Sequence, residues 1–109
     1  MNFEHENLAH GRWYELSLME QLGNIGSEVG RALRWEEKDR KYFDHAVERA
    51  LELFDLTLAD QRWRRRLKEL TRAREVFCDA VSGGKEYKSS LADLDRYFFS
   101  FAFAARIHR

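Results

Sequence analysis

Apolar residues recur at intervals of three and four along this chain of 109 residues, and no proline interrupts them. The clearest series is Leu18, Leu22, Ile25, Val29 and Leu33. These spacings place all five side chains on one face of an α-helix, whereas a half-buried strand would alternate apolar and polar residues at every second position. Because no segment alternates in that way, the sequence predicts an all-α protein.

Short polar segments divide this pattern into four predicted helices, at residues 12–37, 40–58, 61–81 and 90–108. Ser17 and Glu20 have the spacing of a capping box, in which each side chain bonds a free amide at the start of a helix. Trp13 would instead extend the same apolar face upstream if the helix began earlier. Asp39 and Asp60 are suitable N-caps for the second and third helices.

The boundary between the second and third helices is weakly marked, because residues 57–60 contain no glycine, and one continuous helix is the alternative. The stop after the third helix is clear, since glycines such as Gly83 and Gly84 readily adopt the left-handed conformation that ends helices. Four helices with short connections predict an antiparallel up-down-up-down four-helix bundle.

The length and charge of the chain limit its organisation and its partners. A chain of 109 residues is expected to form one domain, with residues 1–11 as a flexible extension because they lack periodicity. Its 19 basic and 19 acidic residues cancel, so no overall field attracts it to nucleic acid or membrane. No apolar run approaches the roughly 18 residues of a membrane span. Without a signal-peptide pattern, we expect a cytoplasmic protein.

Glycines inside the first predicted helix are unusual, because each costs about 1 kcal/mol relative to alanine. Gly26 and Gly30 are four residues apart and share one face, where another backbone can approach closely. A tight crossing within the bundle would explain them. The alternatives are a contact between two copies, a groove for a partner helix, or a kink near Asn24 that Gly23 and Gly26 mark.

The last predicted helix carries more aromatic residues than one core-facing row needs. Phe98 and Phe101 fit that row, whereas Phe99 and Phe103 are four residues apart and rotated away from it. Since a helix that is apolar nearly all round is usually buried on all sides, the excess predicts a second interface. The simplest form is a twofold homodimer, and a bundle that wraps this helix fully is the alternative.

A basic segment lies at the start of the third predicted helix, where residues 62–75 hold seven basic and two acidic residues. The residues that could form one exposed strip for phosphates are Arg62, Arg65, Lys68 and Arg72. A solvated face that pairs with the acidic second helix is the alternative. This segment makes nucleic-acid binding a second candidate function.

Neither a metal nor a cofactor is predicted. None of the four histidines belongs to the Glu-x-x-His pair of di-iron bundles, and His5 and His10 lie in the predicted extension. Cys78 is the one cysteine, which excludes an internal disulfide and a cysteine-based zinc cluster. We expect Cys78 to act as a small apolar residue near the core.

The segment Arg40-Lys-Tyr-Phe-Asp-His45 resembles the arginine-to-histidine spacing of HEPN proteins, which are small helical bundles that often dimerise. The resemblance implies an RNA-directed nuclease or toxin-system component that acts at a dimer cleft. Arg40 would then steady a phosphate and His45 would transfer protons. The alternative is two solvated side chains at a helix start.

The chain from Ser17 onward also resembles a small prokaryotic all-helical family to which we attach no activity. The similar stretches are residues 17–32, 48–57, 84–90 and 103–106. Taken together, the sequence predicts a homodimeric protein-interaction module without catalysis, with an unidentified protein partner. Its predicted interface residues are Gly26, Gly30, Phe99 and Phe103.

Overall fold

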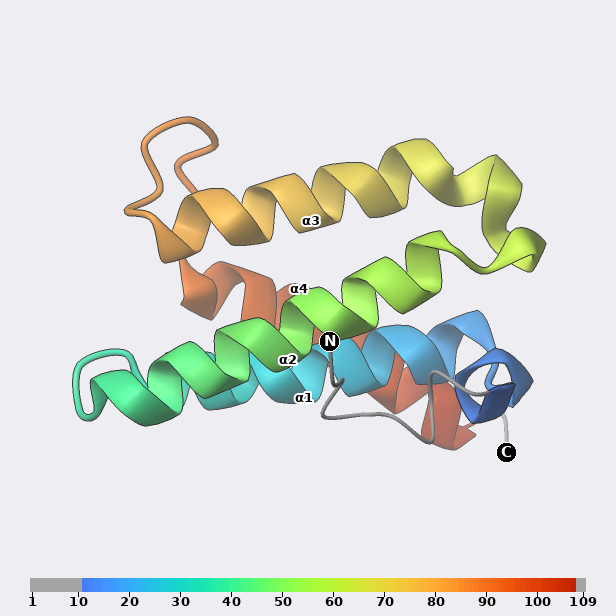
Figure 1. The fold of residues 1–109 in the computed structure, drawn as a ribbon, viewed down its shortest axis with the longest axis horizontal. Helices are drawn as coiled ribbons and strands as arrows, with labels where there is room; N and C mark the ends of the chain where they lie inside the picture. Colours follow the sequence, from blue (N-terminus) through green and yellow to red (C-terminus); the bar gives the residue numbers. More distant parts are fainter. Residues whose placement is uncertain (1–10, 108–109) are drawn as a thin grey trace.

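Four α-helices make up most of the protein, which a computed structural model describes over residues 11–107 (Figure 1). The helices are α1 (Leu18–Trp35), α2 (Arg40–Leu58), α3 (Leu67–Val81) and α4 (Leu91–Ile107), with short 3-10 turns η2 (Trp13–Glu15) and η3 (Gln61–Arg66). Within residues 11–107 there is no strand, so the all-α prediction is confirmed. Residues 1–10 of the predicted extension (1–11) and the predicted helix end at residue 108 lie outside the described residues.

The capping box sets the start of α1 at Leu18, later than the predicted residue 12. The Oγ of Ser17 accepts from the amide of Glu20 at 3.1 Å, and a Glu20 carboxylate oxygen accepts from the amide of Ser17 at 2.9 Å. Leu16 is extended, with ψ of 148°, so the turn at Trp13–Glu15 is a separate element. The upstream extension is therefore wrong, because the backbone leaves the helical path before the cap.

The second and third helices are separate, and the third begins in two steps. Asp60 caps η3 by accepting from the amide of Arg62 at 3.1 Å. Trp63 has φ of −102° and ψ of 22°, outside the helical region, so α3 starts only at Leu67 and not at residue 61. Gly83 and Gly84 end α3 with φ of 117° and 71°, as the sequence predicts.

The core is centred on α1, which packs against both α2 and α4, whereas α3 makes fewer contacts with its neighbours. In Figure 1, α3 runs along the upper edge of the molecule. Phe54 of α2 joins three helices, since its ring centroid lies 5.8 Å from that of Phe77 in α3 and 5.9 Å from that of Phe98 in α4. All three rings are fully or almost fully buried. Leu67, the first residue of α3, is exposed.

A buried polar cluster fixes the end of the bundle where η2, α1 and η3 meet. Gln21 of α1 donates to the carbonyl of Trp13 at 3.0 Å and to the carboxylate of Asp60 at 3.0 Å. Its own carbonyl accepts from the indole N–H of Trp63 at 2.9 Å. The indole N–H of Trp13 donates to the hydroxyl of Thr57 at 3.2 Å. These bonds satisfy polar groups that would be costly to bury alone.

Replacing Phe54 with alanine should lower the free energy of unfolding by about 3–5 kcal/mol, because the ring fills the junction of three helices. Urea denaturation followed by circular dichroism measures the loss. The exposed Leu67 provides the control, and Leu67→Ala should cost less than about 1 kcal/mol. Equal losses in the two variants would contradict this packing.

The polar cluster also predicts an acid-sensitive stability. Hydrogen bonding from Arg62, whose guanidinium lies 2.7 Å from the Asp60 carboxylate, lowers the pKa of Asp60 below its usual value of 3.8. A carboxyl with a lowered folded-state pKa stabilises the fold above that usual value, and the contribution is lost as the pH falls through the folded-state pKa. Asp60→Asn should therefore be less stable than the wild type at neutral pH, and the difference should shrink at about pH 3.

Urea unfolding at both pH values measures this difference. Asp44→Asn provides the control, because Asp44 is exposed and, among the residues that the structure describes, forms an ion pair with the exposed Arg40 alone. If Asp60→Asn is less stable than the wild type by the same amount at both pH values, the charge of the Asp60 carboxylate does not contribute to the stability of the fold.

Candidate protein-interaction surface

Glycines of α1 face α4 of the same chain. A Cβ atom at Gly26 would lie 2.6 Å from the Cβ of Phe98, and one at Gly23 would lie 3.1 Å from the Cα of Ala102. A Cβ at Gly30 would lie 3.0 Å from a carboxylate oxygen of Asp95. The close crossing within the bundle therefore accounts for Gly26, whereas Gly30 faces only the end of the Asp95 side chain. Both glycines also line a groove beside α4, and their predicted contact between copies stays a prediction.

The outward face of α4 exposes a row of large apolar side chains. Phe99 is 65% exposed, Phe103 is 55% exposed and Ile107 is 57% exposed. Successive members are four residues apart, so they follow one side of the helix. Phe98, which is turned by about 100° from Phe99 around the helix, is fully buried. The bundle thus does not wrap α4, and the predicted separation of core and surplus aromatics is present. Ile107 extends the row at the same spacing, which the sequence analysis missed.

A groove of about 470 Å³ runs beside this row, between α1 and α4. Phe99 lies at its α4 side and the three glycines lie at its α1 side. Its charged lining residues are Arg31, Arg34, Asp95 and Arg106. Arg31 is bound to the buried carboxylate of Glu28 at 3.0 Å. Within the described part of the chain, the other three charges have no ion-pair partner.

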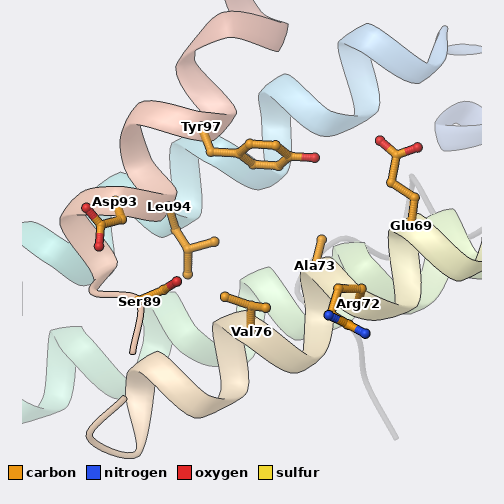
Figure 2. A pocket seen from close by; sticks show the side chains of 8 residues that line it. All are labelled: Glu69, Arg72, Ala73, Val76, Ser89, Asp93, Leu94 and Tyr97. Atoms are coloured by element: carbon orange, nitrogen blue, oxygen red, sulfur yellow. The ribbon is translucent and has the colours of Figure 1, made fainter. Parts of the chain in front are cut away.

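A second cavity, of about 320 Å³, lies between α3 and α4 (Figure 2). Its apolar walls are Ala73, Val76, Leu94 and the ring of Tyr97. Figure 2 shows Tyr97 reaching from α4 across the cavity toward α3. Burial raises the pKa of Tyr97, and the charge of Glu69 raises it further, while the charge of Arg66 acts in the opposite direction.

The charged residues that line this cavity are already engaged within the chain. Glu69 bonds Arg66 at 3.1 Å, and Asp93 bonds Arg96 at 2.5 Å. The guanidinium of Arg72 lies 5.3 Å from the ring centroid of Tyr87. The cavity is therefore mainly an apolar recess between α3 and α4. Its charged lining residues already interact with other residues of the chain.

The basic residues 62–72 do not form a strip of free charges. Arg62 donates to the Leu16 carbonyl at 2.7 Å, binds Asp60, and lies 4.4 Å from the ring centroid of Trp63. It is therefore part of the structural cluster at the end of the bundle. Arg65 and Lys68 are exposed, and neither has an ion-pair partner among residues 11–107. Arg72 lies over Tyr87, as described above. Nucleic-acid binding by this segment stays a prediction.

The structure places Arg40 and His45 on the surface at the start of α2. The Nε of Arg40 lies 3.3 Å from the carboxylate of Asp44, and its guanidinium lies 5.5 Å from the ring centroid of Phe43. Five residues correspond to a rotation of about 140° around a helix, so Arg40 and His45 do not converge within one copy. Their role in RNA cleavage stays a prediction from the resemblance.

No protein-family model, curated protein or solved structure matches the chain. Both resemblances drawn from the sequence therefore stay predictions. Across residues 11–107, no group of three histidine, cysteine, aspartate or glutamate side chains is placed to hold a metal ion. None of the described helices is both long enough and apolar enough to cross a membrane.

The packing of α1 on α4 predicts different effects of alanine at Gly26 and at Gly30. Gly26→Ala should destabilise the fold by about 2 kcal/mol, because the new methyl group would overlap the Cβ of Phe98, which is close to the backbone and moves little. Gly30→Ala should be neutral or stabilising by up to about 1 kcal/mol, since alanine favours helix and the end of the Asp95 side chain can move aside. Thermal unfolding of both variants measures the contrast, and a reversed order would contradict the packing of α1 on α4.

Proposed function

We propose that the protein is a cytoplasmic, homodimeric protein-interaction module without catalysis, and that α4 forms the contact between two copies. The observation that carries this proposal is the row of Phe99, Phe103 and Ile107, each more than half exposed on one side of α4. Large exposed apolar patches on a soluble protein usually mark contact surfaces. Aromatic side chains are also enriched at the centres of protein interfaces.

The arrangement of α4 in the chain supports the same proposal. We infer an up-down-up-down order of the four helices, because Gly23, Gly26 and Gly30 meet α4 residues in reverse sequence order and the connection from α1 to α2 is short. In this order α4 packs one face on α1 and leaves the opposite face to solvent. A twofold contact uses the same patch on both copies, so one exposed row is sufficient to build it.

Phe103→Glu should convert the dimer to a monomer, because the charge would be placed in the apolar centre of the contact. Sedimentation equilibrium should give twice the chain mass of 13.0 kDa for the wild type and the single-chain mass for the variant. The helical content should be unchanged, since Phe103 lies outside the core.

Tyr42→Glu is the matched control, because Tyr42 is 54% exposed on α2, against 55% for Phe103 on α4. This variant should remain a dimer. The proposal fails if the wild type is a monomer at every concentration tested, or if Phe103→Glu still dimerises.

A further inference from the structure

Two charges that have no ion-pair partner among residues 11–107 flank the exposed phenylalanines of α4 at nearly equal distances. Asp95 lies four residues before Phe99, and Arg106 lies three residues after Phe103. With a rise of about 1.5 Å per residue, these separations are about 6 Å and 4.5 Å along the helix axis. Both charges line the groove between α1 and α4, so they lie on the same side of α4 as Phe99.

We propose that the two α4 helices of the dimer pack antiparallel, with Phe99 against Phe103 of the second copy and Asp95 paired with Arg106 of the second copy. This inference rests on the proposed dimer and specifies its orientation and register. The twofold axis forms each of these contacts twice. The difference of about 1.5 Å between the two spacings is small compared with the reach of an arginine side chain.

Charge determines the orientation. In a parallel dimer, Asp95 would lie beside Asp95 of the second copy, and Arg106 would lie beside Arg106, which places like charges together at both ends. In the antiparallel dimer, Asp95 of one copy lies beside Arg106 of the other at both ends, so opposite charges meet. Like charges across an interface are unfavourable and exclude wrong arrangements, so the sequence of α4 selects the antiparallel one.

Neighbouring arginines leave this pairing available. Arg96, which lies close to the exposed row, already bonds Asp93 of its own helix at 2.5 Å. Arg31 is held by Glu28. Arg34 lines the groove on α1 without an ion-pair partner among the described residues, and it therefore serves as a control position. The groove of about 470 Å³ beside Phe99 has room for an aromatic ring from the second copy.

Charge exchange between Asp95 and Arg106 tests the register. Asp95→Arg alone or Arg106→Asp alone should weaken dimerisation about ten-fold or more, because each creates two contacts between like charges. The variant that carries both substitutions should dimerise within about three-fold of the wild type, since both pairs are restored with their signs exchanged. Sedimentation equilibrium measures the three dissociation constants.

Mixing the two single variants gives a second measurement. A heterodimer of one Asp95→Arg chain and one Arg106→Asp chain restores both pairs, so the mixture should dimerise more tightly than either variant alone. This rescue would also show that both variants fold. Arg34→Asp is the control, and combining it with Asp95→Arg should produce no rescue.

The outcomes distinguish this register from the proposed function. If the wild type dimerises but the single variants bind normally, or if neither the double variant nor the mixture restores binding, the pairing is overturned and the dimer stands. If the wild type is a monomer, both proposals fail. Rescue in the Arg34→Asp control as well would show a general charge effect and would also overturn the specific pairing.

Discussion

The close approach of α1 and α4 at Gly26 determines which surfaces of α4 are available. Because Gly26 has no side chain, the Cβ of Phe98 occupies the space where one would be, and the two helix backbones pack at short range. This contact points Phe98 into the core against Phe54. Since a helix turns by about 100° per residue, the same orientation directs Phe99 and Phe103 away from the core. The exposed row and the groove beside it both follow from this one crossing.

Polar bonds hold the end of the bundle where η2, α1 and η3 meet. Gln21 links the turn at Trp13–Glu15 to Asp60 and Trp63, which fixes the connection between α2 and η3. This connection leads into α3, which has few contacts with the other helices. The apolar cavity beside Tyr97 lies between α3 and α4. The same cluster binds Arg62, so a charge that suggests a ligand site in the sequence serves the fold.

The helix ends could be predicted well where the signal is local. Ser17 with Glu20, Asp39, and Gly83 each act within a few residues of the boundary that they set, so the amino-acid pattern contains the whole interaction. The irregular start of α3 could not be predicted in this way. Trp63 leaves the helical region where its indole bonds Gln21, which lies 42 residues earlier in the chain.

The sequence by itself determined the all-α class, the four helices and the excess of aromatic residues on the last one, because periodicity and capping depend on neighbouring residues. Only the tertiary structure decided that Gly26 meets Phe98, that Arg62 is bound to Asp60 and Leu16, and that Phe99, Phe103 and Ile107 are left exposed. The physical reason is that burial of a helix face depends on which distant segment packs against it, and spacing along the chain does not specify that partner.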